Sequence, residues 1–462
     1  MQKLFGWFKR FAMAAKARKR PMPETLLGRM FANTVWLLGG KGFGAVCSLV
    51  YLAILTRALG LKGFGHFSLI FGTSQALIAI AGFQTWRVVV RYGAPHVQRG
   101  DWGAFGRLST LCGMLDAAGA MMGCLAAWVI FFQFNHALDL NSELIQTAFW
   151  FNVAALWALV SAPTGIVRAL DRFDVATYVE AVVPLGRLLA AGVIWLTGPS
   201  LIKFLIAWAV VDLIEAALYW FMARYLAPQA IGWSALKGWR QALKENDRIL
   251  HFFWVTYATA TIDAVKKNGP LLAVGFLVGT KSAGLFRLAQ QLSQGLGKFS
   301  TLLTRAAYAE IARARYAADK KEFRKLTAQT SAIASGAGLL VIVVAVLLGQ
   351  YLLELVGGEE FVGAYPILVG MAVSAAFELG SVAFEPALHS TGNARKALWA
   401  KLISLAILLA IFVPLAHRFE AVGIAAAVAI SAAVAYLVGG FFAWRRIDDV
   451  PDDTQRPDVQ GP

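Results

Sequence analysis

The chain repeats a short glycine-containing motif at corresponding places in its two halves. The first copy is Leu59–Leu69 and the second is Val278–Leu288. Identical residues stand at five aligned pairs of positions: Gly60 and Gly279, Lys62 and Lys281, Gly65 and Gly284, Phe67 and Phe286, and Leu69 and Leu288. Each copy ends one long apolar stretch and opens another. This pattern is typical of a membrane protein built from two related halves.

The composition also places the chain in a membrane. Its 462 residues are 58% hydrophobic and only 15% charged, whereas soluble domains carry about 25% charged residues. The low charge extends over most of the length, and no long stretch alternates apolar and polar residues as the strands of a membrane barrel do. The composition therefore predicts an all-α polytopic membrane protein rather than a soluble domain with one anchor.

Twelve apolar stretches are long enough to cross a bilayer as helices, which takes about 20 residues each. They lie near 31–56, 64–83, 108–132, 145–167, 176–197, 201–223, 249–267, 270–297, 327–353, 361–388, 396–416 and 420–444. With the N-terminus in the cytoplasm, thirty Lys and Arg residues fall in inside segments and five in outside turns. This positive-inside bias supports the twelve spans and cytoplasmic locations for both termini. It also explains the net charge of +16 without a nucleic-acid partner.

The longest polar segment between spans divides the chain into halves of six spans each. The predicted parts are a basic amphipathic cytoplasmic segment (1–30), an N-terminal six-helix lobe (31–223), a cytoplasmic linker (224–248), a C-terminal six-helix lobe (249–446) and a disordered cytoplasmic tail (447–462). An even number of spans in each half puts both copies of the motif on the outer face. The two lobes are therefore predicted to be parallel repeats.

The sequence carries no pattern typical of an enzyme or a metalloprotein. Cys47, Cys112 and Cys124 all lie in apolar spans, without the spacing of a metal-ligand set or a disulfide framework. No Walker motif for nucleotide binding is present. We therefore expect no catalytic residue, no metal and no cofactor.

Charged residues inside the predicted spans indicate a polar interior. Each costs about 2.5–3.5 kcal/mol at the middle of a bilayer unless it is paired or hydrated. They are Lys41, Asp116, Arg187, Asp212, Glu215, Asp263, Lys266, Lys267, Arg287, Lys298, Glu378, Glu385 and Lys401.

Basic side chains suit a phosphate-bearing substrate, and acidic ones suit a coupling ion. The predicted substrate-binding residues are Lys41, Arg87, Arg91, Lys266, Lys267, Arg287 and Lys298, with Arg87 and Arg91 at the cytoplasmic mouth. The ion-coupling candidates are Asp263, Glu378, Glu385, Asp212 and Glu215. Structural roles stay open for the same residues, such as pairing of Asp212 and Glu215 with Arg187, or of Asp263 with Lys266 and Lys267.

Five segments resemble a known transporter family. They are Asn33–Gly60, which holds the first span and its turn, Gly63–Phe67, Arg87–Gly93, Arg168–Phe173 and Val278–Phe286. Together they resemble the motifs of Wzx-type polysaccharide or O-antigen flippases of the multidrug/oligosaccharidyl-lipid/polysaccharide exporter superfamily. The resemblance covers roughly residues 30–445.

The resemblance implies a transporter in the bacterial inner membrane, not an enzyme. Its substrate would be a polyprenyl-diphosphate-linked glycan, moved from the cytoplasmic to the outer leaflet by alternating access and driven by an ion gradient. The expected partners are the lipid bilayer, a polysaccharide polymerase and the chain-length machinery. Three alternatives stay open: a small-molecule drug exporter on the same scaffold, a lipid II flippase, and a membrane glycosyl ligase or polymerase.

Overall fold

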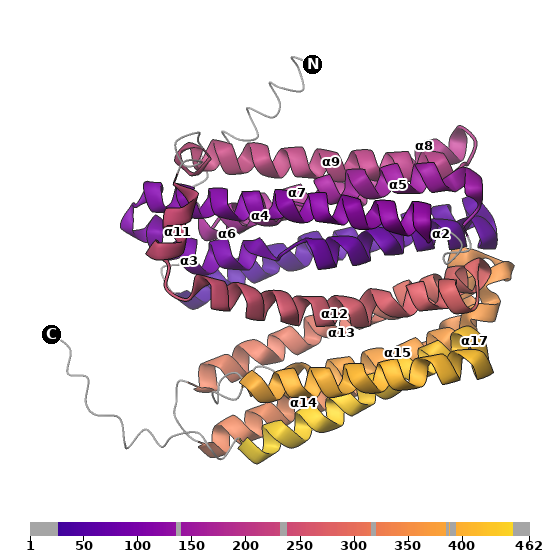
Figure 1. Cartoon of the computed structure of the whole chain (residues 1–462). Helices are drawn as coiled ribbons and strands as arrows, with labels where there is room; N and C mark the ends of the chain where they lie inside the picture. The colour runs from indigo at the N-terminus through magenta and orange to yellow at the C-terminus, as the bar shows by residue number, and fades with distance from the viewer. Residues whose placement is uncertain are drawn as a thin grey trace. The chain divides into compact units, whose positions relative to one another are not determined.

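The computed structural model of the chain describes residues 26–134, 140–231, 238–315, 320–384, 388 and 394–446 (Figure 1). Every regular element within these residues is a helix, which confirms the predicted all-α class. The chain forms two compact units. Unit 1 comprises Met1–Ala58, Ile70–His136 and Leu140–Ala264, and unit 2 comprises Leu59–Leu69, Ala137–Asp139 and Val265–Pro462. The division into six-span lobes at 224–248 stays a prediction.

The helices follow one another with short connections. The earlier ones are α2 (Leu26–Ala81), α3 (Thr85–Arg99), α4 (Trp102–Trp128), the π-helix η1 (Val129–Gln133), α5 (Ser142–Trp157), α6 (Ser161–Ala169), α7 (Phe173–Glu180), α8 (Val182–Leu196), α9 (Leu201–Leu226), the 3-10 turn η3 (Pro228–Ala230) and α11 (Trp239–Glu245). The later ones are α12 (Ile249–Leu277), α13 (Thr280–Arg315), α14 (Lys320–Gly357), the 3-10 turn η4 (Glu359–Ala364), α15 (Tyr365–Gly380), the 3-10 turn η5 (Ser381–Ala383) and α17 (Ala394–Arg446).

Seven helical stretches of the described chain are long and apolar enough to cross a membrane. Two of them, Gly44–Ala81 and Arg395–Arg445, are 38 and 51 residues long, well beyond the roughly 20 residues that one crossing needs. Each contains a residue with a left-handed backbone: Gly60 has φ 63° and Glu420 has φ 52°. Gly60 lies between the predicted first and second spans, and Glu420 is the first residue of the predicted twelfth span. The chain is therefore a multi-pass membrane protein.

The predicted break between the seventh and eighth spans, at 268–269, is wrong. Helix α12 continues through Asn268, Gly269 and Pro270 to Leu277, and α13 begins at Thr280. Polar residues in this segment suggested a break, but their side chains find partners inside the protein instead. Lys266 donates from Nζ to Ser404 Oγ at 2.8 Å. The real turn is at Gly279, whose φ of 111° matches the left-handed φ of its aligned counterpart Gly60.

The two copies of the repeated motif lie against each other within unit 2. A Cβ atom on Gly65 would overlap the carbonyl oxygen of Thr280, and one on Gly284 would lie 3.0 Å from the carbonyl oxygen of Leu61. Leu61 and Thr280 are themselves aligned positions of the repeat, as are Gly65 and Gly284. The contact is therefore reciprocal, as expected of a two-fold related pair. Only glycine permits the two backbones to approach this closely.

The turn η4 completes this junction. The backbone N–H of Leu61 donates to Glu360 Oε2 at 3.0 Å. The rings of Phe64 and Phe361 meet edge to face, with centroids 5.7 Å apart. The remainder of unit 2 is a helical bundle in which α13, α14, α15 and α17 pack on one another (Figure 1).

Unit 1 is built around helices α3, α4, α6, α7 and α9. Its core contains apolar side chains from all five of them, among them Val89, Phe105, Ile166, Val179 and Tyr219. The short helix α11 packs on α4. An ion pair between Arg107 of α4 and Glu245 holds it there. A 3.0 Å contact between His96 Nε2 and Asn246 Oδ1 joins α3 to the residue that follows α11.

Two membrane helices of unit 1 are interrupted, and a buried carboxylate joins the interruptions. The breaks are at Gly82–Gln84, before α3, and at Ala158–Val160, before α6. Asp116 of α4 is only 6% exposed. Its Oδ1 accepts from Thr85 Oγ1 at 2.7 Å, and its Oδ2 accepts from the backbone N–H of Ala162 at 2.7 Å. Thr85 and Ala162 lie in the first turns of α3 and α6, where backbone N–H groups lack helical partners.

A hydroxyl chain extends the same junction. Thr85 Oγ1 lies 2.9 Å from Ser161 Oγ, which accepts the backbone N–H of Trp86 at 3.0 Å. At the end of α2, the hydroxyl of Tyr257 donates to the carbonyl of Ile80 at 2.8 Å. Polar backbone groups freed by the breaks are therefore satisfied inside the protein, as a membrane interior requires.

We expect Gly65→Ala to destabilise the protein, because the new methyl group would overlap the Thr280 backbone. Overpacking of this kind costs about 1–3 kcal/mol. The measurement is the melting temperature of the purified protein in detergent. Gly336→Ala is the matched control, because no atom lies within 4 Å of its added Cβ in helix α14. Equal melting temperatures for the two variants would contradict the close contact.

We expect Asp116→Ala to lower the free energy of unfolding by about 1–3 kcal/mol, because it leaves the buried N–H of Ala162 without an acceptor. Asp101 provides the control: its carboxylate also accepts a helical N–H, that of Ala104 at 2.9 Å, but it is exposed. Asp101→Ala should cost only about 1 kcal/mol. Thermal unfolding followed by size-exclusion chromatography compares the two variants. A smaller effect at Asp116 than at Asp101 would refute its role as the joint between the two breaks.

Candidate functional site

One of the two basic residues predicted for α12, Lys266, makes a side-chain contact with the interior of unit 2. Lys266 donates to Ser404 Oγ in α17, and Ser404 is fully buried. The backbone carbonyl of Ser404 accepts in turn from Ser431 Oγ at 2.8 Å. The ammonium group of Lys266 is therefore positioned by a polar contact between α12 and α17 inside an apolar bundle.

A buried glutamine brings two more of the predicted residues together. Gln290 donates from Nε2 to the backbone carbonyl of Lys267 at 2.9 Å. Its Oε1 accepts from Arg287 Nη1 at 3.3 Å. The side-chain amide of Gln290 thus links the backbone of α12 to the guanidinium of Arg287 on α13. Arg287 and the backbone of Lys267 therefore meet at Gln290 in unit 2, while the side chain of Lys267 is exposed.

Four other predicted site residues of the second half are either exposed or lie outside the residues whose side chains the structure describes. Glu378 and Asp263 are exposed on their helices. The side chain of Lys298 and all of Glu385 lie outside the described residues, as does the side chain of Lys41 in α2. The roles predicted for these five positions, which include Lys41, stay predictions.

The acidic pair of α9 is accompanied by an arginine. Arg187 of α8 donates from Nη2 to Asp212 Oδ1 at 2.7 Å and lies 3.1 Å from Oδ2. Its guanidinium also lies over the rings of Phe71 and Trp208, at 5.3 and 5.6 Å from their centroids. Glu215 interacts electrostatically with both Asp212 and Arg187. This is the arrangement expected of the structural alternative, in which Arg187 pairs with the acids.

The two arginines predicted at the cytoplasmic mouth go to different partners. Both are exposed on α3. Arg91 lies 4.3 Å from the ring centroid of Phe252, whereas Arg87 lies 5.3 Å from that of Trp86. The i, i+4 spacing of Arg87 and Arg91 therefore does not by itself make them a pair.

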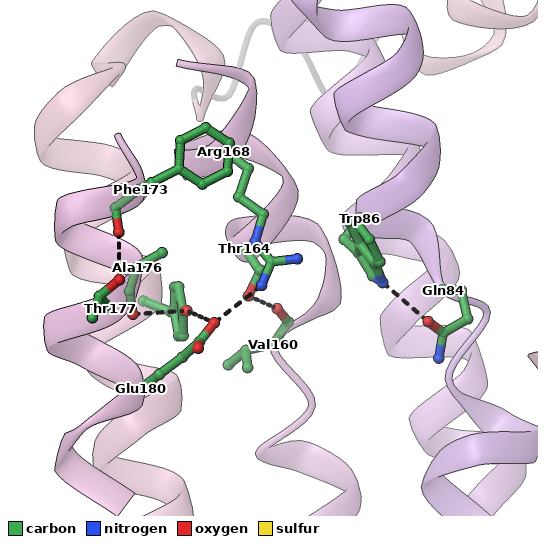
Figure 2. A network of polar contacts seen from close by, with 10 residues as sticks. Gln84, Trp86, Val160, Thr164, Arg168, Phe173, Ala176, Thr177 and Glu180 are labelled. Atoms are coloured by element: carbon green, nitrogen blue, oxygen red, sulfur yellow. Dashed lines mark hydrogen bonds and ion pairs between the residues drawn. The ribbon is translucent and has the colours of Figure 1, made fainter. Parts of the chain in front are cut away.

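The indole ring of Trp86 contacts Arg168 of α6 as well as Arg87 (Figure 2 shows Trp86 and Arg168). The guanidinium of Arg168 lies 4.8 Å from the indole centroid. Arg168 Nη2 also forms an ion pair with Glu180 Oε1 at 3.0 Å. The indole N–H of Trp86 donates to Gln84 Oε1 at 3.0 Å. Helices α3, α6 and α7 thus contribute one cluster of aromatic, basic and acidic side chains.

Sequence reasoning assigned no site role to Asp116, Gln290, Ser404, Trp86 or Arg168. Asp116 gave a signal as the one acid of an apolar span, and Arg168 stood in one of the segments whose sequence resembles that of a transporter family. Gln290, Ser404 and Trp86 gave none, because buried polar and aromatic residues of this kind are common in membrane helices. The described residues contain no group of side chains suited to hold a metal ion.

Comparisons with known proteins agree with this architecture. The profile of a family described as "Polysaccharide biosynthesis protein" matches residues 30–308. The "Inner membrane protein YghQ" of Escherichia coli (strain K12) is 27% identical over 349 residues, which cover 73% of this chain and 94% of that protein.

Solved structures share the fold at low sequence identity. The inward closed conformation of the lipid II flippase MurJ matches with a TM-score of 0.68 and 10% identity, covering 88% of this chain and 87% of that one. An inward-facing multidrug resistance MATE family transporter of the MOP superfamily matches with a TM-score of 0.65 and 14% identity, covering 87% and 94%. The chain thus has the fold of these transporters, and by the family match it belongs to the polysaccharide biosynthesis protein family.

Proposed function

We propose that this protein is a flippase of the bacterial inner membrane that moves a polyprenyl-diphosphate-linked oligosaccharide from the cytoplasmic to the outer leaflet. The family concerns polysaccharide biosynthesis, and the fold is that of transporters, one of which is a lipid II flippase. The observation that carries the proposal is the set of basic side chains on α12 and α13 within apolar unit 2. A diphosphate needs such cationic partners, since guanidinium and ammonium groups bind phosphate oxygens with charge-assisted hydrogen bonds.

The mechanism we propose is alternating access, with the glycan and diphosphate in a polar interior and the lipid tail in the bilayer. Lys266, Lys267 and Arg287 would contact the diphosphate or the glycan, and Lys41 and Lys298 remain candidates for the same role. An ion gradient would drive the cycle. Asp263, Glu378 and Glu385 are the candidates for ion coupling, while Asp212 and Glu215 are less suited because Arg187 already accompanies them. We place both termini in the cytoplasm, and a polysaccharide polymerase with its chain-length machinery would use the product.

A drug exporter on the same scaffold is the second candidate, because a multidrug MATE transporter shares the fold. Export of cationic drugs favours an acidic binding site. The polar region around Gln290 is basic instead, so this candidate is weaker. A lipid II flippase shares both the fold and the need for basic side chains, and substrate assays separate it from the leading proposal. A glycosyl ligase or polymerase is disfavoured by the transporter fold.

The test is a deletion strain in which lipid-linked oligosaccharide and surface polysaccharide are measured together. Deletion should cause lipid-linked repeat units to accumulate while surface polymer disappears. Arg287→Ala and Lys266→Met should restore surface polymer at least about tenfold less well than wild type, because each removes a charge-assisted contact worth about 1.5–3 kcal/mol.

The control is Lys281→Ala, which removes an equal charge from an exposed position at the start of α13. It should restore surface polymer fully, and membrane levels of every variant are checked by immunoblot. Unchanged surface polymer in the deletion strain, together with greater sensitivity to cationic drugs, would replace the flippase proposal with the drug-exporter alternative.

A further inference from the structure

Two guanidinium groups flank one indole ring at the start of α3. The centroid of Trp86 lies 4.8 Å from the guanidinium carbon of Arg168 and 5.3 Å from that of Arg87. Both arginines lie in segments predicted to face the cytoplasm. The indole is held in place by its N–H donation to Gln84 (Figure 2). A guanidinium stacked on an aromatic face keeps its N–H edge directed outward for an anion, with less rotational freedom to lose on binding.

The two guanidiniums differ in their present partners. Arg168 is bound to Glu180, and the side chains of this pair are 27% and 35% exposed. Arg87 is exposed and makes no ion pair with any residue that the structure describes. The cluster therefore carries one compensated and one uncompensated positive charge, both within reach of solvent.

A second contact, from the hydroxyl of Tyr219, holds the carboxylate of Glu180 beside Arg168. The hydroxyl of Tyr219 in α9 lies 3.3 Å from Glu180 Oε1 and 3.4 Å from the carbonyl oxygen of Ala176. Tyr219 is itself buried, so this contact fixes the carboxylate to the core of unit 1. An anion that approaches Arg168 must compete with a carboxylate that does not move away freely.

We propose that Trp86, Arg87 and Arg168 form an entry subsite for the diphosphate of a lipid-linked glycan, and that Glu180 is its built-in competitor. This inference rests on the flippase function proposed above. A diphosphate offers several acceptor oxygens and enough negative charge to engage both guanidiniums. The carboxylate of Glu180 neutralises Arg168 while the subsite is empty. It also lowers affinity, which favours release of the head group onward into the protein.

The cluster makes a prediction that a purely structural ion pair does not. Removing the competing charge with Glu180→Gln should tighten diphosphate binding, by roughly two- to fivefold for a partly exposed pair. Removing the binding charge with Arg168→Gln should weaken it by about tenfold. A structural ion pair predicts the same loss of stability for both variants and no gain in affinity.

The neighbouring ion pair provides matched controls. Arg172 donates from Nε and Nη2 to the two carboxylate oxygens of Asp174, both at 3.0 Å. Arg172→Gln and Asp174→Asn therefore remove the same kinds of charge from the same predicted cytoplasmic surface. Neither variant should change diphosphate affinity by more than about twofold.

The experiment is a titration of the full-length protein in detergent with farnesyl diphosphate, by isothermal calorimetry. Inorganic pyrophosphate and phosphatidylglycerol form separate arms, which distinguish a lipid diphosphate from free pyrophosphate or an ordinary anionic lipid. We expect farnesyl diphosphate to bind tightest, Glu180→Gln to bind it more tightly than wild type, and Arg168→Gln and Trp86→Leu to bind it more weakly. Thermal melting of each variant checks that it is folded.

Three outcomes would overturn the inference. Equal affinity of wild type and Arg168→Gln for farnesyl diphosphate would remove the subsite while leaving the flippase proposal intact. Equal binding of phosphatidylglycerol would make the cluster a membrane-surface contact. No binding of farnesyl diphosphate by the folded wild-type protein would instead count against the proposed function itself.

Discussion

Backbone contact between the two copies of the repeated motif sets the geometry on which unit 2 depends. Gly65 lies against the Thr280 carbonyl and Gly284 against the Leu61 carbonyl, at aligned positions of the repeat. A segment from the first half of the chain is thereby built into the unit formed by the second half. Any side chain larger than hydrogen would separate the backbones. The glycines of the repeat are thus conserved between the two halves for a packing reason, and the left-handed turns at Gly60 and Gly279 bring each helix into that contact.

Several polar groups inside the apolar helices of both units have a partner within the protein. Asp116 accepts one hydroxyl and one backbone N–H, each at a different helix break, and Gln290 connects a backbone carbonyl with Arg287. Arg187 accompanies Asp212. Such partners remove the cost of several kcal/mol that an isolated polar group pays in a bilayer. They also leave basic side chains at defined positions, which a transporter of anionic head groups requires.

Much of the fold could be predicted from the sequence because membrane insertion leaves strong local signals. Apolar length gave the spans, the distribution of Lys and Arg predicted their orientation, and the repeated glycines marked the turns. The end of the second span near Gly82–Gln84 was predicted, since the apolar stretch 64–83 stops there. The break at Ala158–Val160 falls inside the predicted span 145–167, which is therefore wrong as one continuous helix, because Ala158–Val160 contains neither glycine nor proline to mark it. The turn near Gly279 was misplaced for the opposite reason: Lys266 to Pro270 look like a loop, yet tertiary contacts such as Lys266 with Ser404 keep them helical.

The candidate site was harder to predict than the fold, because charge pairing depends on which helices meet. Spacing along α3 grouped Arg87 with Arg91, whereas packing between α3 and α6 places Arg168 beside Trp86. The pairing of Asp212 with Arg187 could be anticipated as an alternative, since neighbouring spans of opposite charge often pack together. No sequence pattern indicated that Glu180, Arg168 and Tyr219 would converge from three helices.

The most direct measurement of the central claim is lipid flipping by the purified protein in liposomes. A fluorescent polyprenyl-diphosphate oligosaccharide would be placed in both leaflets, and a membrane-impermeant glycosidase would report the fraction accessible from outside over time. The account predicts that protein-containing vesicles expose the inner-leaflet pool faster than protein-free vesicles, and that an imposed ion gradient changes the rate. Exposure no faster than in protein-free vesicles, from a folded protein that transports a cationic dye instead, would contradict it.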